Sequence, residues 1–180
     1  MKKIIVITGK TGAGKSTVCK RLQEYFNYPL LTFADMGKEF ANKNGYNRIR
    51  ECHLAMALEE FVEGISNHIF NTIDKELTTC DTVLIDGLYI AKTVEKLKEK
   101  YDCSILYLKA SDTIRYERIA ERLSITVEQA RVENNVKEKL KDDVGIDILI
   151  KNSSCIIDGN KSQNEVFNDT KEYIENYVKG

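Results

Sequence analysis

The sequence predicts an α/β fold: a three-layer α/β/α sandwich on a five-stranded parallel sheet, with a small helical lid. Three observations support this prediction. Short apolar runs alternate along the chain with longer amphipathic stretches, which favours parallel strands joined by helical crossovers. Runs such as residues 83–85 are apolar at every position, as expected for a sheet that is covered on both faces. A glycine-rich segment directly follows the first apolar run.

The expected strands and helices follow one another in regular order. The apolar runs predict strands at residues 4–8, 30–33, 82–86, 104–108 and 155–158. Helical periodicity predicts helices at residues 16–26, 54–77, 91–100, 112–123 and 164–178. A chain of 180 residues is expected to form one domain, spanning residues 1–180.

Composition and charge argue against several classes of protein. Apolar residues at 42% and charged residues at 31% are typical of an ordinary globular protein. The formal net charge of −1 gives no basic surface for nucleic acid, so no nucleic-acid partner is expected. No apolar stretch approaches the roughly 20 residues of a membrane span, so no membrane partner is expected either. The five cysteines are scattered and odd in number, which favours reduced thiols in a cytoplasmic protein.

The glycine-rich segment has the features of a phosphate-binding loop. Residues 9–16 read Gly-Lys-Thr-Gly-Ala-Gly-Lys-Ser, between an expected strand and an expected helix. Glycines let the backbone turn tightly and point its N–H groups at an anion, and the helix start adds its positive end. A lysine then reaches the β- and γ-phosphates, and the serine hydroxyl is placed to bind Mg²⁺. The order of strand, loop and helix predicts a P-loop that binds ATP and Mg²⁺.

The loop by itself does not distinguish a kinase from a GTPase or a motor. The sequence contains no Asn/Thr-Lys-x-Asp motif after a later strand, which a GTPase would be expected to carry, and a motor would be larger. The residues expected to bind the nucleotide are Gly9, Thr11, Gly12, Ala13, Gly14, Lys15, Ser16 and Thr17.

Two aspartates follow expected strands. Asp86 ends the apolar run at residues 82–85, and Gly87 comes next. Ligands of a parallel sheet lie at the carboxyl ends of its strands, so Asp86 is expected to hold Mg²⁺ or to position the acceptor. Asp35 similarly follows residues 30–33 and is a candidate for substrate binding. The alternatives are a turn or N-cap role for Asp86 and a helix N-cap role for Asp35.

Basic residues gather after the fourth expected strand. Arg115, Arg118 and Arg122 are spaced i, i+3 and i+7, which places them on one helix face. Such a face is expected to neutralise charge on a migrating phosphoryl group, although pairing with Glu117 and Glu121 on the surface is the alternative. Further lysines follow at Lys137, Lys139 and Lys141. The region at about 112–142 is therefore a candidate lid that would exclude water from the phosphates.

With these residues in view, the chain resembles the nucleoside monophosphate kinase superfamily, and within it the archaeal-type cytidylate kinases. The resemblance is carried by Ile-Leu-Tyr-Leu-Lys-Ala at 105–110, Arg-Ile-Ala-Glu-Arg at 118–122, Ile-Thr-Val-Glu-Gln-Ala at 125–130 and Gly-Ile-Asp at 145–147. It implies that Gly9, Gly14, Lys15, Ser16 and Thr17 bind ATP and Mg²⁺, and that Arg118 and Arg122 act on the phosphates. A second resemblance, to dephospho-coenzyme A kinase-like and archaeal adenylate kinase-related proteins, rests on Asp86-Gly87 and the general layout.

The sequence departs from the family pattern on the acceptor side. Lys38 and Leu88 stand where the family has arginines, and Lys139 falls near a further one. Lysine keeps the charge of arginine but loses its bidentate fork. We therefore expect Lys38, Arg48 and Arg50 to line the acceptor cavity, with one of the two arginines supplying the fork and the other lying on the surface. The alternative is two exposed arginines at a helix start.

Together these observations predict a kinase that transfers the γ-phosphoryl group of ATP to a cytidylate-like nucleoside monophosphate or a related phosphate-bearing acceptor. The expected catalytic residues are Lys15, Asp86, Arg118 and Arg122; Ser16 and Asp86 are the expected metal ligands; and the substrate residues are Asp35, Lys38, Arg48, Arg50 and Asp86. The acceptor is expected to bind in a helical region at about 35–80. The alternatives are a dephospho-coenzyme A kinase-like enzyme and a nucleotide-dependent switch or assembly ATPase. A monomer or a homodimer is expected.

Overall fold

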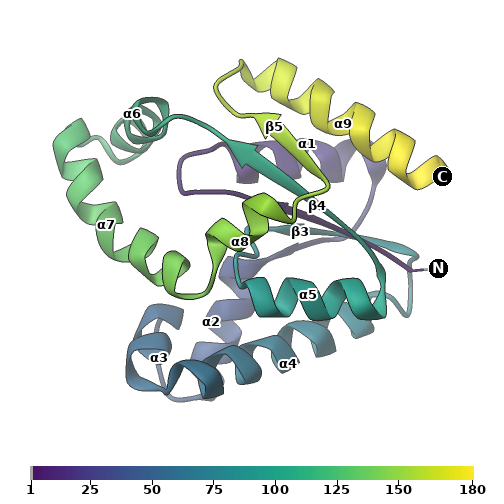
Figure 1. The fold of residues 1–180 in the computed structure, drawn as a ribbon, viewed down its shortest axis with the longest axis horizontal. Helices are drawn as coiled ribbons and strands as arrows, with labels where there is room; N and C mark the ends of the chain where they lie inside the picture. Colours follow the sequence, from purple (N-terminus) through teal and green to yellow (C-terminus); the bar gives the residue numbers. More distant parts are fainter. Residues whose placement is uncertain (1) are drawn as a thin grey trace.

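Parallel strands form the centre of the computed structural model, which describes residues 2–180. Within these residues the sheet has five strands in the order β2-β3-β1-β4-β5 (Figure 1). Their bounds are Lys3–Thr8 for β1, Leu30–Thr32 for β2, Thr82–Asp86 for β3, Asp102–Lys109 for β4 and Cys155–Asp158 for β5. All four pairings are parallel, and β1 is central, between β3 and β4. The predicted five-stranded parallel sheet is thereby confirmed, and the loop after β1 opens at the middle of its carboxyl edge.

Helices cover both faces of the sheet, which confirms the predicted three layers. Figure 1 shows α1 and α9 on one face and α2, α4 and α5 on the other, with α6 and α7 beyond the carboxyl ends of the strands. The helix bounds are α1 Lys15–Phe26, α2 Phe33–Lys43, α3 Ile49–Ala55, α4 Leu58–Glu76, α5 Ala91–Lys100, α6 Asp112–Leu123, α7 Val127–Asp143, α8 Ile146–Lys151 and α9 Gln163–Lys179. Across the described residues, we find no helix with the combined length and apolar character needed to cross a bilayer.

Hydrophobic clusters pack against both faces of the sheet. Successive residues of a strand point to opposite faces, so Ile4 and Val6 of β1 pack with α2, α4 and α5, whereas Ile5 and Ile7 pack with α1 and α9. All four side chains are fully buried, and burial of such a side chain contributes roughly 1.5–3 kcal/mol. The two cores fix the carboxyl ends of β1, β3 and β4, and these ends position the site described below.

The structure differs most clearly from the predicted elements in two regions. The single helix expected at residues 54–77 is instead α3 and α4, because Met56 is extended with φ −95° and ψ 154° and ends α3. The strand expected at residues 30–33 ends one residue early. There the hydroxyl of Thr32 accepts a hydrogen bond from the Asp35 N–H at 3.0 Å and caps α2, which begins at Phe33. The cap of this helix is therefore Thr32 and not Asp35.

Candidate active site

The loop between β1 and α1 has a backbone that only glycine can adopt at key positions. Gly12 and Gly14 have φ values of 84° and 96°, in the left-handed region. A Cβ atom on Gly12 would lie 2.6 Å from the carbonyl oxygen of Arg115, which rules out a larger residue. Gly14 is the N-cap of α1 and provides no side-chain cap. The first N–H groups of α1 are therefore free to bind an anion at the positive end of the helix.

Lys15 folds back over this loop. Its Nζ donates a hydrogen bond to the carbonyl oxygen of Lys10 at 2.9 Å. Burial lowers the pKa of Lys15, while the neighbouring carboxylate of Asp86 opposes that shift. The ammonium group is thus held at the loop and not in bulk water. At the loop its charge is available to a phosphate.

Two cavities adjoin at the loop. The first has a volume of about 390 Å³ and is lined by the loop, α6 and the start of α9, including Gly12, Ala13, Gly14, Thr17, Arg118 and Arg122. The second, of about 340 Å³, is lined by residues around Phe33, Arg48, Asp86, Tyr89 and Lys141. Thr11, Lys15 and Ser16 line both. Gly14 and Arg118 therefore line one space and Asp86 lines the other, and Lys15 lies where the two spaces meet.

Asp86 occupies the carboxyl end of β3, in the second cavity beside Lys15. Its side chain is largely buried at 8% exposure, and its Oδ1 atom has no hydrogen-bond partner among the described residues. The N-cap of the next helix, α5, is Ile90, so Asp86 does not serve as a helix cap. An unpartnered carboxylate oxygen in a cavity that Ser16 also lines fits Mg²⁺, which takes one or two protein oxygens and completes its shell with phosphate and water.

The arginines of α6 divide between two roles. Arg118 and Arg122 line the first cavity, and Arg118 donates to the carbonyl oxygen of Gly159 at 2.8 Å. Both are therefore placed beside the loop, as expected for groups that act on the nucleotide phosphates.

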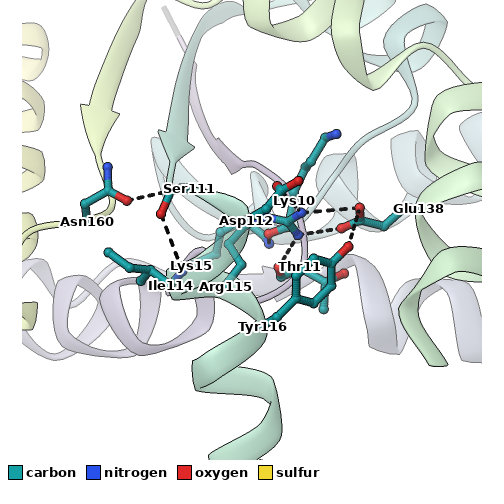
Figure 2. A network of polar contacts seen from close by, with 10 residues as sticks. All are labelled: Lys10, Thr11, Lys15, Ser111, Asp112, Ile114, Arg115, Tyr116, Glu138 and Asn160. Atoms are coloured by element: carbon teal, nitrogen blue, oxygen red, sulfur yellow. Dashed lines mark hydrogen bonds and ion pairs between the residues drawn. The ribbon is translucent and has the colours of Figure 1, made fainter. Parts of the chain in front are cut away.

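Arg115 differs from our expectation, because it does not face a ligand. It is 1% exposed and pairs with Asp112 at 2.8 Å and with Glu138 of α7 (Figure 2). It also donates to the carbonyl oxygen of Thr11 at 2.7 Å. Burial alone would lower the pKa of Arg115, but the two carboxylates raise it above its ordinary value. Arg115 thus ties α6 and α7 to the loop, and neither Glu117 nor Glu121 is its partner.

The acceptor residues predicted from sequence are only partly brought together. Arg48 and Arg50 both line the second cavity and both are exposed, so the structure does not single out one of them as the acceptor residue, and the alternative of two exposed arginines stays open. The i, i+2 argument fails because Arg48 is extended, with φ −137° and ψ 142°, and precedes the helix that contains Arg50. Lys38 is exposed and lines neither cavity, contrary to prediction. Asp35 is also exposed, and it contacts the hydroxyl of Thr32.

Several residues of the second cavity were not predicted as site residues. Phe33 and Tyr89 form an edge-to-face aromatic pair with ring centroids 4.6 Å apart. Lys137 and Lys141 of α7 also line this cavity, whereas Lys139 between them is exposed and lines neither space. The sequence showed the three lysines but not which of them turns inward. Tyr89 stands only three residues after Asp86, a spacing that could have indicated its place near the carboxyl edge.

These features define a P-loop phosphotransferase. They are a glycine-rich loop with its lysine, a buried carboxylate beside that lysine, and two cavities that meet there. Such a site binds a nucleotide on one side and a second substrate on the other, and it transfers a phosphoryl group between them. The fold and the site together identify the class as P-loop kinase.

The chain belongs to the AAA domain family, which matches residues 5–142 and so includes the loop, Asp86 and the arginines of α6. It is 31% identical over 141 residues to a cytidylate kinase of Methanocella arvoryzae, covering 75% of this chain and 71% of that protein. It is also 26% identical over 193 residues to a cytidylate kinase of Staphylothermus marinus, covering 98% of each. The predicted resemblance to archaeal cytidylate kinases is confirmed.

A solved structure shares the fold at lower sequence identity. The shikimate kinase of Aquifex aeolicus superposes with a TM-score of 0.64 at 16% identity, covering 97% of this chain and 98% of that one. This likeness confirms the P-loop kinase architecture of the sheet and its helices.

Proposed function

We propose that this protein transfers the γ-phosphoryl group of ATP to a nucleoside monophosphate, cytidylate-like or a related small phosphate ester. The observation that carries the proposal is the charge of the second cavity. Five of its lining residues are cationic and one is a carboxylate, Asp86; the cations are Lys15, Arg48, Arg50, Lys137 and Lys141. An acceptor phosphate brings roughly two negative charges next to ATP, and an excess of positive charge around the cavity offsets the repulsion between them.

The aromatic side of the cavity suits the rest of the acceptor. Phe33 and Tyr89 present a ring pair beside the cations, and aromatic rings stack on the faces of nucleobases. Names of relatives also support the proposal, because two proteins similar to this chain are called cytidylate kinases.

The transfer itself is a displacement at phosphorus. An oxygen of the acceptor phosphate attacks the γ-phosphorus, and the bond between that phosphorus and the β–γ bridging oxygen breaks, leaving ADP and a diphosphate product. Lys15 neutralises charge at the junction of the cavities, and Arg118 and Arg122 do so on the donor side. Ser16 and Asp86 would hold Mg²⁺, which supplies further charge neutralisation on the phosphates when bound.

We further propose that the chain acts as one domain in which α6 and α7 serve as the lid and the segment at about 35–80 holds the acceptor. The support is the position of α6 and α7 beyond the carboxyl edge (Figure 1). A cover there would keep water, the competing acceptor, away from the γ-phosphoryl group.

The test is a panel of acceptors in steady-state kinetics with ATP and Mg²⁺: CMP, UMP, AMP, dephospho-coenzyme A, and no acceptor. We expect turnover with at least one nucleoside monophosphate to exceed the acceptor-free ATPase rate by orders of magnitude. Preference for dephospho-coenzyme A would contradict the proposed substrate class. Equal ATPase rates with every acceptor would instead favour a switch. Binding can be checked by thermal shift, since a ligand at a hundredfold excess over Kd stabilises the protein by about 2.7 kcal/mol.

Replacement of either acceptor-side arginine should weaken acceptor binding selectively. Arg48→Ala and Arg50→Ala each remove a cation from the second cavity but none from the first. A charge-assisted hydrogen bond contributes about 1.5–3 kcal/mol, so we expect the acceptor KM to rise about 10- to 100-fold with the KM for ATP unchanged. Lys38→Ala is the comparison variant, because Lys38 lies outside both cavities. If Lys38→Ala raises the acceptor KM and the arginine variants do not, the acceptor binds elsewhere.

A further inference from the structure

A lysine near the end of α7 lies against the P-loop. The Nζ atom of Lys141 donates a hydrogen bond to the Thr11 hydroxyl at 3.1 Å and lies 5.3 Å from the ring centre of Tyr89. Lys141 lines the second cavity together with Lys15, and Thr11 lines both cavities. Its ammonium group is therefore placed where donor and acceptor sides meet.

The position of Lys141 is set by contacts that converge on one loop residue. Glu138 lies three positions earlier on α7 and holds Arg115, which in turn donates to the carbonyl oxygen of Thr11 (Figure 2). Thr11 thus accepts hydrogen bonds from Arg115 of α6 at its carbonyl and from Lys141 of α7 at its hydroxyl. Residues three apart on a helix share a face, so the Glu138 contact that docks α7 also directs Lys141 inward, whereas Lys139 points to solvent.

Lys141 has no anionic partner within the described residues 2–180, and a bound anion would neutralise its charge. No carboxylate lies within ion-pair distance of its Nζ in the part of the chain that the structure describes. Burial lowers the pKa of Lys141 to about 7. Nearby charges act in both directions: Lys15, Arg115 and Lys137 lower this pKa further, and Glu138 raises it. A half-buried ammonium group with other cations around it is stabilised when a phosphoryl group arrives, because the anion favours its protonated form.

We infer that Lys141 is a further catalytic residue, which contacts the γ-phosphoryl group of ATP at the junction of the two cavities. The inference rests on the proposed function only in assigning the ATP phosphates to the P-loop side, and it does not depend on the acceptor. Lys141 takes up a proton from solvent when the γ-phosphoryl group binds and then neutralises its charge during transfer.

The first test measures the affinities for ADP and for a non-hydrolysable ATP analogue without any acceptor. In Lys141→Met, the ratio of the affinity for the analogue to the affinity for ADP is expected to fall about 10- to 100-fold, the range of a charge-assisted hydrogen bond. The affinity for ADP itself should not change. Lys139→Met, two positions away and exposed, should leave that preference intact. An unaltered preference in Lys141→Met, or an equal loss in Lys139→Met, would overturn the inference.

The second test is calorimetry at pH 7.5 in buffers of different ionisation enthalpy. The unmodified protein should take up more protons with the ATP analogue than with ADP, and Lys141→Arg should retain the preference for the analogue without that extra uptake, since arginine stays protonated. Equal uptake with both nucleotides would overturn the inference even if Lys141→Met does not fold. Because no acceptor is present, these outcomes are separate from failure of the acceptor panel.

Discussion

Lys15→Ala is expected to abolish phosphoryl transfer while the fold stays intact. Lys15 lines both cavities, and its ammonium group is held at the loop by a hydrogen bond to the Lys10 carbonyl oxygen. Removal of one preorganised donor to a developing negative charge typically lowers kcat by about 10²- to 10³-fold. For a full charge at the migrating group we expect about 10³-fold or more, measured as kcat with the best acceptor of the panel.

The direction in which Lys15→Ala changes the stability of the fold can also be predicted. Because burial lowers the pKa of Lys15 below its unfolded value, the folded state opposes protonation of this group, and its charge destabilises the fold at neutral pH. We therefore expect Lys15→Ala to keep or raise the melting temperature. Lys10→Ala is the matched control, since that side chain is in the same loop but lines neither of the two adjoining cavities. Near-normal turnover of Lys15→Ala would show that Lys15 has no role in transfer.

Glu138→Ala is expected to be the most destabilising single change considered, at about 3 kcal/mol. It leaves the guanidinium of Arg115, which is 1% exposed, without its more buried partner. Removal of one member of a buried ion pair costs more than the pair contributes, because the remaining charge stays desolvated. For a domain of this length the melting temperature should fall by about 6–12 °C.

Asp112→Ala provides the comparison for this effect. Asp112 pairs with the same guanidinium, but its side chain is 71% exposed, and exposed ion pairs contribute about 0–1 kcal/mol. We expect its melting temperature to fall by no more than a few degrees. If the two variants melt at the same temperature, the contact between α6 and α7 does not depend on Glu138.

The sheet and the nucleotide side of the site could be predicted because their signals are local. β3 is buried along its whole length and its centre is a continuous apolar run, and for this reason its bounds match the expected run. The bounds of β5 also match, although this edge strand is only partly buried. The P-loop likewise lies within eight consecutive residues, where glycine positions, lysine and serine have fixed geometric roles. Helices α5 and α6 also have the predicted bounds.

The acceptor side depends on tertiary contacts that no local pattern encodes. The break between α3 and α4 at Met56 lies in a segment without proline or glycine. The helical periodicity of the sequence therefore gave no sign that the helix ends there. The spacing of Arg115 and Arg118 places both on one helix face, but it does not show that Arg115 meets Glu138, 23 positions further along the chain. Nor could spacing show that Lys141 turns inward while Lys38 stays exposed, since the packing of α7 and α2 decides both.

The outermost strands of the sheet bear on how copies of this protein associate. A long, flat edge strand offers a row of unpaired backbone groups on which another chain can build, whereas short edges limit this. Here β2 has three residues, β5 has four, and each forms one margin of the sheet. Pro29, which has no N–H group, directly precedes β2. Extension of the sheet from one copy to the next is therefore disfavoured, and a homodimer of this chain would form through its helical surfaces.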